Sequence, residues 1–158
     1  MMNKMLKVLG AVFLAILVGV VALIGYAAYS GPKLDASSKA YVDQVVPIIV
    51  STWSPEEVLK RASPQFRQAV NDEQLKELLV KLSKLGRLER YEGSKGDSNV
   101  SFTSQAGKVI SATYVANAKF ENGDAQINIR IIQLGGQWRL LSFYVNSLIF
   151  LKPIERQS

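Results

Sequence analysis

The chain has 158 residues, which is enough for one domain of ordinary size and an additional segment. It contains neither cysteine nor histidine, which excludes disulfides, thiol nucleophiles, histidine bases and the usual zinc ligands. The formal net charge is +6, but the basic residues form no arginine-rich run. We therefore expect a solvated, mildly basic surface and no nucleic-acid partner.

The first distinctive stretch covers residues 8–32, which contain no charged side chain. A helix over residues 8–30 would be roughly 34 Å long and would span the ~30 Å hydrocarbon core of a bilayer. Tyr26 and Tyr29 would lie at its far end, where aromatic rings favour the interface. We predict a transmembrane anchor. The alternative is a signal peptide that is cleaved after Ala27.

Two lysines, Lys4 and Lys7, precede this stretch, and the short basic head favours an N-terminus in the cytoplasm. Two further lysines follow the stretch closely, so the lysine bias is small. We expect residues 1–32 to form a cytoplasmic head and transmembrane anchor. Residues 33–158 are expected to form one α+β domain on the other side of the membrane.

Residues 34–53 carry apolar side chains at helical spacing, which predicts a helix with one buried face. Gly31 and Pro32 are expected to separate this helix from the anchor. Pro47 lies in the interior and is expected to kink or split it, because proline lacks a backbone donor and clashes one turn back.

Two short helices are predicted next. Residues 54–57 combine a capping serine with proline at the first helical position, which favours a helix that ends near Ala62. A Ser-Pro pair then begins a short turn that carries Phe66. The second helix begins at Asn71 and stops at Gly86. Five leucines give it an apolar stripe: Leu75, Leu78, Leu79, Leu82 and Leu85.

The remaining chain has the character of antiparallel strands. Residues 87–92 alternate and predict a strand, residues 93–99 are polar and predict a loop, and residues 100–102 predict a short strand. Three longer strands follow between Lys108 and Asn146. Asn-Gly in the first turn and Gly-Gly in the second favour type I′ hairpins.

These three strands differ in their apolar faces. The first two alternate and predict a sheet that is covered on one side. The alternation slips at Ile131 and Ile132, which indicates a bulge or burial on both sides. The third strand, residues 138–145, has apolar side chains on both faces, which predicts a strand that is central in the sheet or covered twice.

The run Gly135-Gly136-Gln137-Trp138-Arg139-Leu140, followed by Phe143, resembles the last-strand signature of the nuclear transport factor 2-like (cystatin-like) superfamily. The hairpin at residues 120–123 and the strand entry at residues 85–86 are also similar. The resemblance covers roughly residues 34–146. More narrowly, the layout resembles small bacterial proteins of this fold that carry an N-terminal membrane segment. It implies a cone of about three helices packed on a curved antiparallel sheet of four or five strands.

This resemblance implies a single-pass protein of the bacterial inner (plasma) membrane, with its C-terminal domain on the periplasmic or extracytoplasmic side. One hypothesis is a non-catalytic binding or assembly module, whose partner is an envelope protein, another copy of this chain or a small ligand. The alternative is an isomerase- or dehydratase-type enzyme that uses the cone pocket, with Asp43 and either Tyr114 or Tyr144 as acid and base. We assign no catalytic residue, no metal ligand and no cofactor, because the superfamily alone fixes no activity.

Two sets of residues are candidates for contact with a ligand or partner. Large aromatic residues are expected to line the core or a pocket: Trp53, Tyr114, Trp138 and Tyr144. An apolar run without alternation follows the last strand: Leu148, Ile149, Phe150 and Leu151. Such a run cannot lie on one face of a strand, so we expect it to contact a partner chain or the membrane surface, or else to be core.

Overall fold

The structure is a computed structural model of the whole chain. It describes the backbone of residues 2–150 and the side chains of residues 12–25 and 31–150. The chain divides into two compact units, Met1–Leu34 and Asp35–Ser158. The boundary expected from the sequence, after residue 32, lies two residues before this division.

The first unit consists of the N-terminal part of helix α1, Met2–Thr52. The large apolar side chains between Val12 and Ile24 are 48% to 69% exposed. The predicted span of residues 8–30 lies partly outside the residues whose side chains are described. Within the described part, no helix is both long enough and apolar enough to cross a membrane.

The predicted break between the anchor helix and the following helix does not occur. Gly31 and Pro32 do not interrupt α1, and Pro47 does not split it. A proline removes one hydrogen bond from the helix ladder, and packing can offset that loss. On both sides of Pro47 the helix is held by fully buried side chains, including Val46 and Ile49.

Three short helices follow α1: α2 Pro55–Arg61, α3 Pro64–Ala69 and α4 Asp72–Leu82. Each begins with a side-chain cap: Ser54 Oγ, Ser63 Oγ and Asn71 Oδ1 accept hydrogen bonds from backbone N–H groups of the first turn. The helix starts at Ser54 and Asn71 were predicted, whereas the turn predicted at Ser63 is a short helix. A short 3₁₀ turn, Ser83–Leu85, then ends at Gly86, whose φ is 84°. The predicted leucine stripe is buried except for Leu78, which is 46% exposed.

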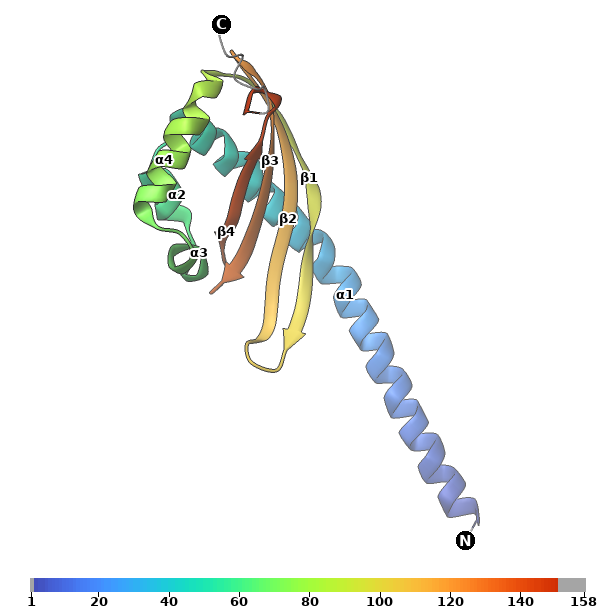
Figure 1. Cartoon of the computed structure of the whole chain (residues 1–158). Coiled ribbons are helices and arrows are strands. Elements are labelled where there is room, and N and C mark those ends of the chain that lie inside the picture. Colours follow the sequence, from blue (N-terminus) through green and yellow to red (C-terminus); the bar gives the residue numbers. More distant parts are fainter. Residues whose placement is uncertain (1, 151–158) are drawn as a thin grey trace, which may run out of the picture. The chain divides into compact units, whose positions relative to one another are not determined.

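The second half of the chain forms a four-stranded antiparallel sheet with the order β1-β2-β3-β4 (Figure 1). Its strands are β1 Leu88–Thr103, β2 Gly107–Phe120, β3 Gly123–Leu134 and β4 Gln137–Asn146. The part of α1 from Asp35 onward contacts one face of this sheet, through hydrogen bonds to β1 and β2. The fold class is therefore α+β, with the helices before the sheet, as expected.

The loop predicted at residues 93–99 is wrong, because these residues belong to β1. Residues 94–99 pair with residues 111–116 of β2, after a register shift between Tyr91 and Ser94, and the pairing continues to Thr103. Gly96 allows a close approach that another residue would not, since a Cβ there would lie 2.0 Å from the Thr113 carbonyl oxygen. A strand that is fixed by its partner in this way needs no apolar alternation of its own.

The two hairpin turns differ in their geometry. In the second turn Gly135 and Gly136 have φ values of 56° and 78°, as a type I′ turn requires. In the first turn the two loop residues are Glu121 and Asn122, and neither has positive φ, so the type I′ prediction is wrong there. Their side chains fix this turn instead: Glu121 Oε2 accepts from the Arg87 N–H at 2.8 Å, and Asn122 donates to a backbone carbonyl of the 3₁₀ turn.

The last strand, β4, is an edge strand, so the prediction of a central strand is wrong. Ile131 pairs with Leu140 whereas Arg130 pairs with Ser142, so Leu141 is an extra residue at a bulge. The bulge predicted from the slip near Ile131 is thus confirmed. It also shifts the side-chain alternation by one residue, which places both apolar sets of β4 on the core side: Trp138 and Leu140 before it, Phe143 and Val145 after it.

Candidate functional site: a groove beside the edge strand

An acidic side chain that the sequence singled out, Asp43, holds α1 against β1. Its Oδ1 accepts hydrogen bonds from Tyr91 Oη at 2.7 Å and from Ser94 Oγ at 2.6 Å, and its Oδ2 forms an ion pair with Lys39. Burial acts to raise the pKa of Asp43, but these three hydrogen bonds outweigh it and hold that pKa below its usual value. The carboxylate is therefore a weakened base.

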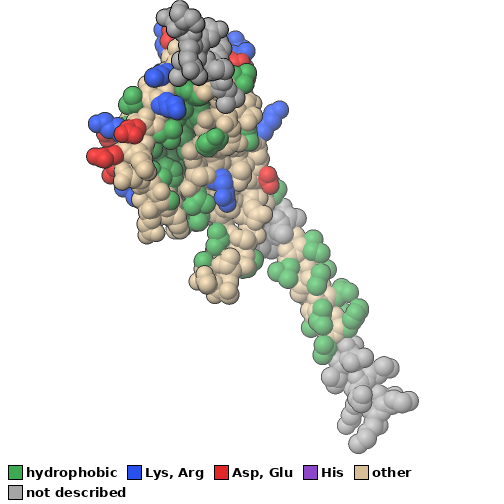
Figure 2. All heavy atoms as spheres, in the orientation of Figure 1, with side chains coloured by type: hydrophobic (Ala, Val, Ile, Leu, Met, Phe, Trp, Pro, Cys, Tyr) green, Lys and Arg blue, Asp and Glu red, His purple; other side chains and the backbone are tan. Residues whose placement is uncertain are grey.

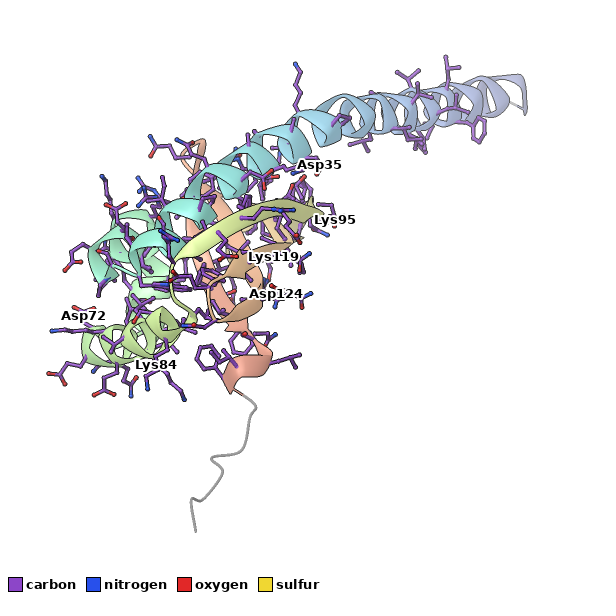
Figure 3. All side chains as sticks on the ribbon, turned by 90° about the horizontal axis from the view of Figure 1, so that it is seen from above. Asp35, Asp72, Lys84, Lys95, Lys119 and Asp124 are labelled. Atoms are coloured by element: carbon purple, nitrogen blue, oxygen red, sulfur yellow. The ribbon has the colours of Figure 1, made fainter. Side chains whose placement is uncertain are left out.

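A second carboxylate makes the same kind of contact two turns earlier on α1. Asp35 Oδ1 accepts from the Ser98 backbone N–H at 2.8 Å and from the Ser98 hydroxyl, which lowers the pKa of Asp35. Figure 3 shows Asp35 on the part of α1 that faces β1. The neighbouring Ser38 hydroxyl lies 2.8 Å from the Tyr114 hydroxyl on β2. Asp43 and Tyr114 thus have separate partners, and the acid–base pair predicted between them does not form a hydrogen bond.

The four aromatic candidates have different surroundings. Trp53 and Tyr114 are core: Trp53 lies against Phe120 with ring centroids 5.8 Å apart, and its buried Nε1 has no hydrogen-bond partner. Trp138 is also buried and donates from Nε1 to Ser37 Oγ at 3.2 Å, but it also lines a surface hollow. Tyr144 is 63% exposed, so it lacks the enclosed surroundings that a catalytic acid needs.

The C-terminal candidates form part of a 3₁₀ turn, Leu148–Phe150. Leu148 is 77% exposed, whereas Ile149 and Phe150 are half-buried. They border a broad hollow of about 830 Å³ that Tyr144 also lines. Leu151 lies outside the described residues.

A hollow with mostly apolar walls lies between α4 and β4 and has a volume of about 340 Å³. Apolar side chains gather between the helices and the sheet on the face shown in Figure 2. The groove is lined by residues of α2, α3, α4 and β4, chiefly Val58, Phe66, Val70, Leu75, Leu78, Leu79, Leu141 and Phe143. The sequence identified several of these side chains as core, but gave no sign that they border an open groove.

Next to this groove, the segment that contains Ala62 and Ser63 already lies along the edge of β4. The Ser63 N–H donates to the Leu140 carbonyl at 2.8 Å, and Ala62 forms a parallel bridge with Leu140. Beyond Leu140, no strand of the described residues pairs with this edge of β4. The groove therefore places apolar side chains next to main-chain groups that can pair with an added strand.

No group of three or more carboxylates that could hold a metal ion occurs among the described residues. The polar clusters that the structure does show, around Asp35 and Asp43, are engaged in holding α1 on the sheet.

No protein-family model matches this chain, and no curated protein matches it. Among solved structures, the chain is similar to a protein from Novosphingobium aromaticivorans DSM 12444 named "Putative Scytalone Dehydratase". The two are 14% identical, and the aligned part covers 63% of this chain and 74% of the other. The TM-score is 0.30, and at that level the similarity carries no argument about fold or activity.

Proposed function

We propose that this chain is a non-catalytic binding module of the bacterial cell envelope, anchored in the inner membrane by a single N-terminal helix. In this proposal the domain after the anchor is a cone of the nuclear transport factor 2-like fold on the periplasmic side. The motif at residues 135–140 supports the fold, as does the order of helices before a four-stranded meander. The observation that carries the function is the apolar groove beside the free edge of β4.

The occupant that fits this groove is an extended segment of an envelope protein with apolar side chains at alternate positions. Its backbone would pair with the edge of β4, continuing the pairing that Ser63 makes at Leu140. Its apolar side chains would lie on Leu78, Phe143 and their neighbours. Main-chain pairing supplies affinity in such complexes, and the apolar pockets supply selectivity.

The uncharged residues 8–32 support the anchor. Their apolar side chains are exposed wherever they are described, between Val12 and Ile24, and a surface of this size is costly in water.

The enzyme alternative is less well supported. A catalytic carboxylate that acts as a base near neutral pH needs a raised pKa. The pKa values of Asp35 and Asp43 are both lowered, and each carboxylate is occupied by serine or tyrosine hydroxyls that fix α1 on β1.

Photo-crosslinking in intact membranes tests the groove. A benzophenone side chain in place of Leu78 should cross-link to a single partner segment, because Leu78 lines the groove. The matched control is Val80, which is on the same helix and 61% exposed but does not line the groove. A synthetic peptide of the cross-linked segment should bind the purified full chain and should bind Phe143→Ser more weakly. Equal cross-linking at both positions, or cross-linking to a second copy of this chain, would contradict the proposed partner.

Alkaline extraction of membranes tests the anchor. The wild-type chain should stay in the membrane pellet. Leu17→Arg should reduce the retained fraction, since a charge at the helix centre costs about 2.5–3.5 kcal/mol on the insertion scale. A soluble mature chain that begins near Ala28 would show that the segment is a cleaved signal.

A further inference from the structure

A separate hollow of about 400 Å³ lies where α1, α2 and β4 meet. It is lined by residues that are far apart in the sequence: Tyr41, Lys60, Arg61, Gln137, Trp138 and Arg139. Three of these six side chains are cationic and two are aromatic. The hollow shares no lining residue with the apolar groove, so it is an independent feature of the domain.

Both guanidinium groups are held in place before any ligand arrives. Arg139 donates to the Lys60 carbonyl at 3.2 Å and to Gln137 Oε1 at 2.9 Å. Arg61 donates to the Glu57 carbonyl at 2.8 Å and forms an ion pair with the Glu57 carboxylate. A guanidinium whose orientation is fixed loses less entropy when it binds an anion.

The hollow carries an excess of positive charge. Glu57 balances Arg61, but among the described residues no carboxylate forms an ion pair with Lys60 or Arg139. The charges of Arg61 and Arg139 also act on the Tyr41 hydroxyl: burial raises the pKa of Tyr41, and the two cations oppose that rise. The phenol therefore stays protonated at neutral pH and can donate a hydrogen bond into the hollow.

We propose that this hollow binds an anionic oxygen group of the phosphate class, carried by a small molecule or by a lipid headgroup. Arg139 and Lys60 contact the anion, since their charge is not balanced by the protein. The Tyr41 hydroxyl adds a neutral donor. The Trp138 ring is held in place by its hydrogen bond to Ser37. It gives the hollow an apolar wall for the group that carries the phosphate.

Calorimetric titration of the purified full chain in a nonionic detergent tests this site, with inorganic phosphate as the first probe. We expect saturable binding that Lys60→Gln and Arg139→Gln each weaken by about tenfold or more, as for loss of a charged hydrogen bond. Lys60 is exposed, so its replacement leaves the fold intact even if Arg139→Gln does not. The matched control is Lys81→Gln on the exposed face of α4, which removes the same charge elsewhere and should change nothing.

Two further titrations identify the source of the phosphate group. Short-chain phosphatidylglycerol below its micelle concentration presents a phosphodiester headgroup with acyl chains, whereas glycerol phosphate presents a phosphate monoester without acyl chains. Tighter binding of the lipid supports a headgroup site, and tighter binding of glycerol phosphate supports a free phosphate ester. Absence of saturable binding by all three probes would overturn the proposal, as would equal loss in the Lys81→Gln control.

Discussion

Helix α1 contains two apolar regions with opposite surroundings. Between Val12 and Ile24 the large apolar side chains are exposed, whereas between Val42 and Val50 five of them are buried: Val42, Val45, Val46, Ile49 and Val50. The difference is one of pattern. The first region is apolar all round the helix. The second region, together with the two turns before it, has one apolar face and a polar face that includes Lys39 and Gln44.

Hydrophobicity alone therefore does not decide what packs in the domain. One sheet can cover only one face of a helix, so an amphipathic segment suits it and a uniformly apolar one does not. Polar side chains then fix the position of the packed region, because Asp35, Ser38 and Asp43 each bond to the sheet.

The largest expected difference between the two regions concerns unfolding of the domain. Ile49→Ala should lower the free energy of unfolding by about 2–5 kcal/mol, because it removes a fully buried side chain and leaves a cavity. Leu17→Ala, which truncates a half-exposed side chain of the first region, should change it by less than about 0.5 kcal/mol. Denaturant unfolding of the full chain in detergent, followed by tryptophan fluorescence, measures both.

If both variants lower the free energy of unfolding by similar amounts, the first region is part of the same cooperative unit. If Ile49→Ala lowers it only slightly, the packing of α1 on the sheet adds little to stability.

The polar contacts of the second region predict a pH dependence. The pKa values of Asp35 and Asp43 are lowered in the folded chain by their hydrogen bonds, so both groups bind protons more readily when the chain is unfolded. Their contribution is therefore fully present above the unfolded pKa of about 3.9 and is lost as the pH falls through the lower folded values. We therefore expect the melting temperature to fall as the pH drops below about 4.

The matched variant is Asp43→Asn, which keeps the shape of the side chain and removes its titration. Its melting temperature should be lower than that of the wild type at pH 7, and the two should converge as the pH falls through the lowered folded pKa of Asp43. A constant difference across this range would mean that the Asp43 carboxylate is not linked to folding.

Much of the fold could be predicted because its causes are local. The capping side chains Ser54, Ser63 and Asn71 begin helices within a few residues of themselves. The Gly135-Gly136 turn is likewise set by two residues that accept positive φ. The bulge in the last hairpin showed itself as a local slip in the apolar pattern.

The errors arose where distant residues decide the structure. Residues 94–99 form a strand because β2 pairs with them and because Asp35 accepts a hydrogen bond from Ser98, and a polar sequence gives no sign of either. The edge position of β4 could not be predicted either. The bulge at Leu141 shifts the side-chain alternation by one residue, so a single apolar face appears in the sequence as two.

The candidate sites were less predictable than the fold for the same reason. The groove joins α4 to β4, and the cationic hollow joins Tyr41 to residues 60–61 and 137–139. Each residue alone is an ordinary leucine, lysine or arginine. Only the tertiary structure brings the members of each site together.

The C-terminal run presents the contrast between exposed and buried apolar residues within three positions, and it carries the smallest expected effect. Leu148 is 77% exposed, so Leu148→Ser should change the free energy of unfolding by less than about 0.5 kcal/mol. Phe150 is half-buried, so Phe150→Ser should lower the free energy of unfolding by more than Leu148→Ser does.

If Leu148 contacts a partner, Leu148→Ser should keep the melting temperature of the wild type but no longer co-purify with that partner from membranes. Phe150→Ser should change both the melting temperature and the co-purification. A loss of several kcal/mol in Leu148→Ser would instead identify the run as core. If Leu148→Ser changes neither the melting temperature nor the co-purification, Leu148 does not contact the partner.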